Sequence, residues 1–222
     1  MPTKMTGDFS AYPEVLRDVI PYLVGETCEL RSSWQTYKHL FMTSAARTEI
    51  LGKRLGGLLG VFQNLVQDDM FVSVARLTDK DSKQQKNLTL WTLVHRCEQW
   101  DANAGRLVRA EIESLADEVA DIRAHRHKRL AHFDLSVSLG QATLPIVTFN
   151  RLFGAIAKIE SILNLVSQLA INTTTMFEIL DHRDITGMAE VTVYKAMAYD
   201  AAEAAGVIES RAWRRFAPAT SE

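Results

Sequence analysis

The segment RAHRHKRLAHFD, residues 123–134, gathers the side chains of this sequence that are best suited to phosphate chemistry. It holds four basic side chains and three histidines, whereas the whole chain carries a formal net charge of −2. Cleaving RNA without a metal needs a general base that works near neutral pH and a cation beside the scissile phosphate. Histidine, whose unperturbed pKa is about 6.5, suits the first role, and the planar guanidinium of arginine suits the second. His132 and Arg126 could supply these roles.

Arg126 draws attention because it falls on the apolar stripe of a long helix that we predict over residues 103–131. A charged side chain rarely enters such a stripe without a partner. Arg126 therefore either neutralises an acid, such as Asp134 or one near Tyr37, or faces a subunit cleft that binds an anion. On an ideal helix Arg126 and His132 diverge by more than about 100°, so they meet only if the helix ends near Ala131 or if two chains join symmetrically. At about 100° per residue, the stripe contains Leu115, Val119, Ile122, Leu130 and Phe133.

The other bases of the segment have a structural explanation. Acids early in a helix and bases late in it complement the helix macrodipole, each by about 0.3–1 kcal/mol, and this accounts for Arg123, Lys128 and Arg129. A metal site is not expected, because His125 and His127 are two residues apart and point to different sides of a helix, and no cysteine lies nearby. We therefore expect no metal and no cofactor.

The composition indicates an all-α protein. The chain has 222 residues, of which 47% are apolar, with only 11 glycines and 5 prolines, and helix-favouring residues dominate most of it. The near-neutral charge means that any contact with nucleic acid must use a local patch. Cys28 and Cys97 lie far apart, which favours two free thiols. Since MPTKMTGDFS has no apolar core and no apolar run approaches about 20 residues, we expect a cytoplasmic protein without a membrane span.

The elements predicted from apolar periodicity form a helical bundle of mostly antiparallel neighbours. A clean seam over residues 149–170 marks one helix as core-facing. Gly52, Gly56 and Gly60 share one stripe, which predicts the close approach of another helix. We divide the chain into an N-terminal segment (1–25), a helical domain (26–170) and a C-terminal helical extension (171–222). The helices are expected at about 26–42, 46–77, 87–100, 103–131, 149–170 and 187–205.

Several stretches resemble a known family. RHKRLAH (126–132) fits the Arg-x(4–6)-His signature of HEPN domains, the superfamily named for higher eukaryotes and prokaryotes nucleotide-binding. A wider resemblance is to the HEPN-like domain of abortive-infection (Abi) proteins. In that family a segment like VARLTDKDSKQQKNLTLWTLV (74–94) precedes a helix that ends like RHKRLAHFD, and YKHLF (37–41) also looks similar. The resemblance covers roughly residues 26–169.

The resemblance implies an all-α, often dimeric fold. Active members of the superfamily are metal-independent endoribonucleases with the motif at a dimer cleft, and many are toxins of toxin–antitoxin or phage-defence systems. Carried onto this sequence, it assigns Arg126 and His132 as the catalytic pair and His127 to the polar position after the arginine, where relatives most often have Asn. We expect the remaining site residues to bind substrate (Lys128, Arg129 and Tyr37, together with His127) or to support the pair (Asp134).

Three functions follow from these expectations. The first is an endoribonuclease that leaves a 2′,3′-cyclic phosphate and has as partners RNA, a second copy of the chain and an antitoxin of the nucleotidyltransferase type. The second is a non-catalytic HEPN-like module that binds RNA, a nucleotide or a protein through the same cleft. The third is a structural all-α homodimer in which Arg126 pairs inside its own chain.

Overall fold

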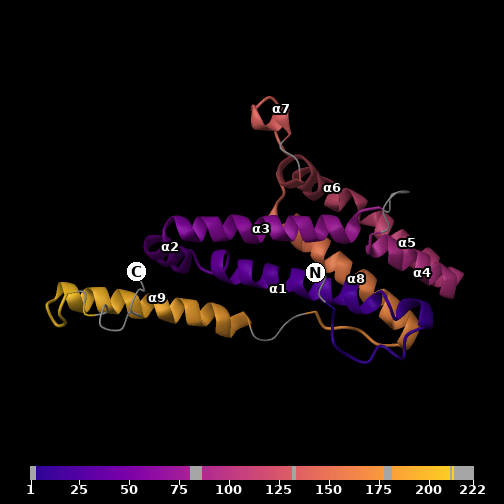
Figure 1. The fold of residues 1–222 in the computed structure, drawn as a ribbon, viewed down its shortest axis with the longest axis horizontal. Helices are drawn as coiled ribbons and strands as arrows, with labels where there is room; N and C mark the ends of the chain where they lie inside the picture. The colour runs from indigo at the N-terminus through magenta and orange to yellow at the C-terminus, as the bar shows by residue number, and fades with distance from the viewer. Residues whose placement is uncertain (1–3, 81–86, 132–133, 178–181, 211, 213–222) are drawn as a thin grey trace, which may run out of the picture.

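The computed structural model describes residues 4–80, 87–131, 134–177, 182–210 and 212 (Figure 1). Every regular element in these ranges is a helix, which confirms the predicted all-α bundle. The elements are η1 (Glu14–Leu16), α1 (Ile20–Phe41), α2 (Ala45–Leu55), α3 (Gly57–Thr78), α4 (Leu90–Trp100), α5 (Ala102–Ser114), α6 (Ala116–His125), the π-helical turn η2 (Arg126–Ala131), α7 (Leu135–Ser138), α8 (Phe149–Ile171) and α9 (His182–Ala204).

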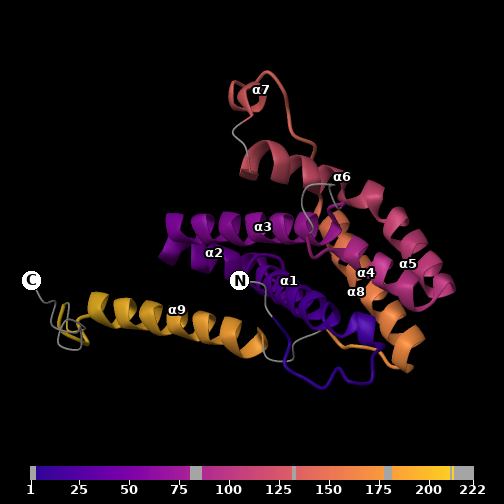
Figure 2. The same ribbon diagram turned by 45° about the vertical axis from the view of Figure 1, so that its right-hand side comes forward.

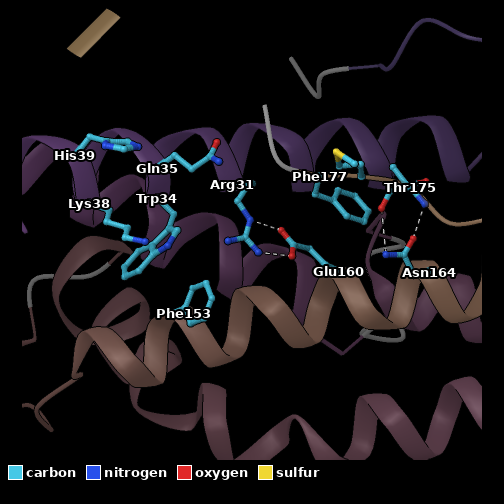
Figure 3. A pocket seen from close by; sticks show the side chains of 11 residues that line it. Arg31, Trp34, Gln35, Lys38, His39, Phe153, Glu160, Asn164, Thr175 and Phe177 are labelled. Atoms are coloured by element: carbon cyan, nitrogen blue, oxygen red, sulfur yellow. Dashed lines mark hydrogen bonds and ion pairs between the residues drawn. The ribbon is translucent and has the colours of Figure 1, made fainter. Parts of the chain in front are cut away.

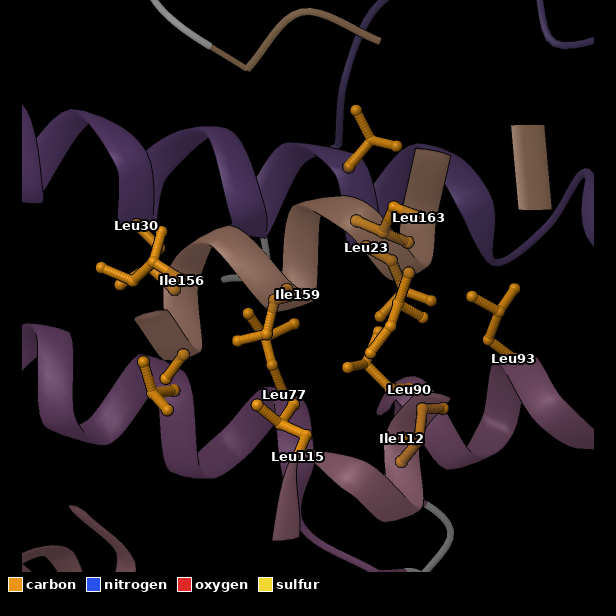
Figure 4. Packing of buried hydrophobic residues seen from close by; sticks show 14 of the residues in the cluster. Leu23, Leu30, Leu77, Leu90, Leu93, Ile112, Leu115, Ile156, Ile159 and Leu163 are labelled. Carbon is orange, nitrogen blue, oxygen red and sulfur yellow. The ribbon is translucent and has the colours of Figure 1, made fainter. Parts of the chain in front are cut away.

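The core forms where α1, α3 and α8 meet the α4–α5 pair and α6 (Figures 1 and 2). Leucine and isoleucine side chains from these helices interdigitate there, as Figure 4 shows. The predicted seam of α8 is confirmed through its centre, because five of its residues are at most 1% exposed: Leu152, Ile156, Ile159, Leu163 and Val166. Burial of this kind contributes about 25 cal/mol per Å² of apolar surface. The packing of α8 against its neighbours therefore stabilises this helix more than the helix propensity of its residues does.

Among the described residues, α8 is the one helix long and apolar enough to cross a membrane by length and composition alone. Counting uninterrupted apolar runs had predicted no such segment, because Arg151, Lys158 and Glu160 break the run. In the bundle these three charges pair with Asp121, Glu111 and Arg31 respectively. The apolar side of α8 meets α1, α5 and α6, and this packing accounts for its composition.

The first helix begins earlier than predicted and crosses the boundary that we placed after residue 25. Pro21 lies in the first turn of α1, where its missing N–H costs no intrahelical hydrogen bond, so it starts the helix rather than interrupting it. The segment before α1 is attached to the last part of α8, because the hydroxyls of Tyr12 and Ser167 lie 2.8 Å apart in a buried hydrogen bond. At the other end of the chain, α9 packs on α1 and α2.

Two helices that we predicted to be continuous are each broken in two. The helix over 46–77 stops at Gly56, whose φ of 51° lies in the left-handed region. The helix over 103–131 turns at Leu115, which is 1% exposed and anchors the corner. Within the described part of the chain no other helix approaches the glycine stripe, because nothing lies within 4 Å of a Cβ placed on Gly52 or Gly60. The glycine that does permit close approach is Gly105 of α5, which faces the backbone of α4.

Both cysteines are free thiols, as predicted. Cys97 is fully buried, and this desolvation raises the pKa of its thiol to about 12. Cys28 is half-buried, and burial likewise raises its pKa. Neither side chain has the lowered pKa of a reactive cysteine.

Candidate functional site

The backbone changes from α-helix to π-helix at Arg126, where the Arg-x(5)-His motif begins. The apolar side of α6, with Val119 and Ile122 fully buried, packs against α3. From Arg126 to Ala131 the backbone then forms the π-helical turn η2, an arrangement that is rare and occurs frequently at functional sites. Arg126 begins this turn, and its side chain is 39% exposed. It therefore lies at the edge of the apolar stripe rather than sealed within it.

Asp79, directly after α3, holds the arginine in place. The Nη2 atom of Arg126 lies 3.2 Å from Oδ2 of Asp79, and Nε of Arg123 lies 3.8 Å from Oδ1 of the same carboxylate. Arg123 also donates to the backbone carbonyl of Thr78. Two guanidinium groups thus meet the carbonyl end of α3, which is the negative pole of its dipole. Partial burial lowers the pKa of Arg123, and Asp79 opposes that shift.

Arg126 faces a pocket of about 360 Å³ between α1, the end of α3 and the residues before α4. A second arginine, Arg76, lines the same pocket and is paired with Glu26 of α1. The two arginines and the two carboxylates of the lining balance in formal charge, and Arg123, which also faces Asp79, is not among the lining residues. The remaining lining residues are Leu23, Leu77, Asp79, Asn87 and Leu88. The pocket thus combines an apolar floor with guanidinium groups that can bind phosphate bidentately.

Of the other predicted site residues, three follow Arg126 on η2. His127 and Lys128 are exposed. Arg129 pairs with Asp68 of α3, so η2 is fastened to α3 at this residue as well. His132, the predicted catalytic base, and Phe133 lie outside the described residues.

Asp134 and Tyr37 do not partner Arg126. Asp134 caps α7, accepting hydrogen bonds from the Ser136 hydroxyl at 2.5 Å and the Val137 amide at 3.1 Å, and these bonds hold the pKa of its carboxyl below the usual range. Tyr37 is 1% exposed, accepts a hydrogen bond from Gln63, and is absent from the lining of the Arg126 pocket. The expectation that Arg126 pairs with Asp134 or an acid near Tyr37 is corrected: its partner is Asp79.

Sequence reasoning missed the carboxylates of this site. Asp79 belongs to the Leu-Thr-Asp element of the family-like stretch, and its position just before a polar loop was the signal that could have identified it. Glu26 is 8% exposed although it is charged, and no sequence pattern distinguishes it from other helical acids. His125 is a packing residue, with Nε2 2.7 Å from the carbonyl of Pro145 and its ring 5.3 Å from that of Phe71.

The family model HEPN_AbiU2, described as AbiU2, matches residues 16–188. The chain belongs to the AbiU2 family of HEPN proteins. The match spans α1 through the start of α9, so it includes every element that lines the Arg126 pocket. The resemblance to HEPN-like domains of abortive-infection proteins is thereby confirmed. No curated protein and no solved structure matches this AbiU2-family chain significantly.

Proposed function

We propose that this AbiU2-family protein is a metal-independent endoribonuclease of a phage-defence or toxin–antitoxin type system. The observation that supports the proposal is the position of Arg126, which lies partly exposed at a pocket that a second arginine, Arg76, also lines, and which is paired with Asp79. Its partners would be RNA, a second copy of the chain and an antitoxin of the nucleotidyltransferase type in the cytoplasm. Membership of the HEPN superfamily, which is associated with ribonuclease activity, supports the same reaction class.

In the proposed reaction the ribose 2′-oxygen attacks the adjacent phosphorus while the bond from phosphorus to the 5′-oxygen breaks. His132 takes the proton of the 2′-hydroxyl or gives one to the departing 5′-oxygen. Arg126 binds the phosphate and stabilises its developing charge, an effect commonly worth a few kcal/mol per donor. A guanidinium has five N–H donors, so its contact with Asp79 can persist while another edge receives the phosphate. The products are a 2′,3′-cyclic phosphate and a 5′-hydroxyl.

The test is cleavage of cellular RNA by purified protein in EDTA. We expect Arg126→Ala and His132→Ala to lower the rate by about 100-fold or more. Arg106→Ala is the matched control, because Arg106 is an exposed arginine of α5 that donates to the side chain of Asn103 in the same helix. Equal cleavage by wild type and His132→Ala would reject the proposal, and so would 3′ ends without a cyclic phosphate.

One observation favours a second candidate, a non-catalytic module that binds RNA through the same pocket. Arg126 and Arg76 already face carboxylates, so most of the pocket's charge is neutralised inside the chain. In this case the protein binds RNA with an affinity that falls as salt rises, and no cleavage product forms. Arg126→Ala then weakens binding and changes nothing else.

We infer that the second copy of the chain covers the first half of α3. Residues 56–67 carry no charge, and Leu58, Val61 and Leu65 are 65%, 56% and 61% exposed. Single exposed leucines are ordinary, but a contiguous apolar face marks an interaction surface. In a twofold contact the same face meets itself, and residues close to the axis lie near their own copies. Like charges there would repel, so a charge-free face fits a second copy. The same helix carries Asp79 at its other end, which links this face to the motif.

A further inference from the structure

A second pocket, of about 380 Å³, lies between α1, α8 and the segment 172–177 that follows α8 (Figure 3). It shares no lining residue with the Arg126 pocket. Its outer wall is held by Asn164, whose amide donates to the carbonyl of Thr175 and accepts from the amide of Thr175 at 2.6 Å. The cavity is therefore built by packed helices and a pinned segment, and it is of the size that small ligands occupy.

One wall of this pocket is aromatic. The rings of Trp34 and Phe153 are stacked with their centroids 5.5 Å apart and their planes 29° from parallel. Trp34 is 5% exposed, whereas Phe153 is 42% exposed, so the tryptophan supports a phenylalanine ring that is open to a ligand. Arg31 lies 5.4 Å from the centre of the Phe153 ring and is fixed by its two hydrogen bonds to Glu160 (Figure 3). A flat aromatic group would contact this wall at the exposed part of the Phe153 ring.

The same pocket contains an unsatisfied acceptor. Gln35 is 9% exposed and lines the cavity, and its buried Oε1 has no hydrogen-bond partner in the part of the chain that the structure describes. Buried acceptors without partners are rare and unfavourable, so a ligand N–H donor would satisfy this one. Lys38, one turn beyond Trp34, is exposed and adds a cation to the pocket. Arg31, Lys38 and Glu160 together leave one formal positive charge.

We propose that this pocket binds a nucleotide. The base stacks on Phe153, an exocyclic amino group of adenine or cytosine donates to Oε1 of Gln35, and the phosphate lies near Lys38. Stacking on an aromatic side chain is the usual way in which proteins hold an unpaired base. The same chemistry would recognise a free mononucleotide or one nucleotide of single-stranded RNA. The inference stands independently of cleavage at Arg126.

Calorimetric titration of the full chain with AMP tests the proposal. We expect AMP to bind more tightly than adenosine or ribose 5-phosphate, because each of those lacks one of the two recognised groups. Phe153→Leu keeps an apolar side chain but removes the ring, and we expect it to raise the Kd of AMP about 10-fold. Lys38→Gln should raise the Kd of AMP and leave that of adenosine unchanged. Lys53→Gln, on an exposed lysine of α2, is the matched control.

Gln35→Met separates recognition from a structural role. Wild type should prefer AMP over purine riboside 5′-monophosphate, which lacks the amino group, and the Met variant should lose that preference. Arg126→Ala should bind AMP like wild type, so failure at the Arg126 pocket is distinguishable from failure here. Adding a five-residue oligoadenylate to the Arg126→Ala variant, in which the other pocket is disabled, assigns the source: tighter binding of the oligonucleotide indicates RNA, and tighter binding of AMP indicates a free nucleotide. No binding of AMP at about 5 mM, or unchanged binding by Phe153→Leu, overturns the proposal.

Discussion

At the residue scale, Asp79 supplies the negative charge that Arg126 and Arg123 need. A second chain or a bound anion could otherwise have supplied it. It faces Arg126 and Arg123 at once, and it stands at the carbonyl end of α3, where cations are favoured. Arg123 is half-buried and its Nε has no hydrogen-bond partner among the described residues. The carboxylate is therefore the charge that allows these two guanidiniums to share one corner of the fold.

Asp79→Asn should lower the free energy of unfolding by about 1–3 kcal/mol, because Arg123 keeps its charge and loses its counter-charge. Urea unfolding followed by circular dichroism measures this. Asp18→Asn is the control, since Asp18 is 60% exposed where it pairs with Arg96 and should change stability by less than about 0.5 kcal/mol. Equal losses in the two variants would contradict the assigned role.

The sequence predicted that Arg126 needs a negative partner, but it left open whether that partner is an acid of the same chain or an anion in a subunit cleft, and it did not identify the acid. A cation on an apolar stripe requires a partner for electrostatic reasons that hold in any fold. Asp134 is closer to Arg126 along the chain, yet its side chain caps α7. The partner is Asp79, which directly follows α3 and lies far from the motif in sequence. Tyr37 was expected near the site because of its family-like segment, and packing buries it instead.

At the element scale, the tightest fit lies between α4 and α5. The two helices join at Asp101, whose side chain accepts from the Ala104 amide at 2.7 Å and so starts α5 directly after α4 ends. This abrupt connection brings Gly105 against Glu98. A Cβ on Gly105 would lie 2.8 Å from the Cα and N atoms of Glu98, closer than side chains approach backbone.

Gly105→Ala should therefore destabilise the protein by more than about 2 kcal/mol, since helix backbone rather than a flexible side chain must move. Gly52→Ala provides the opposite case. Gly52 lies inside α2 with open space around its Cβ position, so alanine should stabilise the protein by about 0.5–1 kcal/mol. Thermal unfolding of both variants checks the pair, and a neutral Gly105→Ala would refute the close contact.

The elements show what periodicity can and cannot predict. The seam of α8 was predicted because an apolar stripe repeats at helical spacing whether or not the rest of the fold is known. The breaks at Gly56 and Leu115 were not, because each lies inside a pattern that continues on both sides and only tertiary packing selects the turn. The glycine that permits close helix packing is Gly105, which does not belong to the predicted stripe of Gly52, Gly56 and Gly60.

At the scale of the whole molecule, the first half of α3 exposes an apolar face that no other element of the described chain covers. Figures 1 and 2 show this helix between α1 and α6, and it also contacts η2. If a second copy covers Leu58 and Leu65, the proposed assembly holds two Arg126 pockets, one from each chain. The proposed ribonuclease would then be an assembly of two chains.

The double variant Leu58→Glu/Leu65→Glu should convert a dimer into a monomer, because the same face of both copies would become acidic and four unpaired carboxylates would be buried in the contact. Light scattering coupled to size exclusion measures the mass. Leu107→Glu on α5, where the leucine is 43% exposed outside this face, should leave the dimer intact. A wild-type mass of one chain would show that the face has another use.

The hydrogen bond between the hydroxyl groups of Tyr12 and Ser167 joins residues that are 155 positions apart. During synthesis the N-terminal segment and α1 emerge long before α8, so the apolar side of α1 that α8 covers must wait for more than half of the chain. A nascent chain stalled before residue 149 has no α8 to close it and leaves Leu23 and Leu30 without that part of their cover. Closure of the bundle is thus timed by translation, and chaperones that recognise exposed apolar helices are expected to bind ribosomes carrying that intermediate.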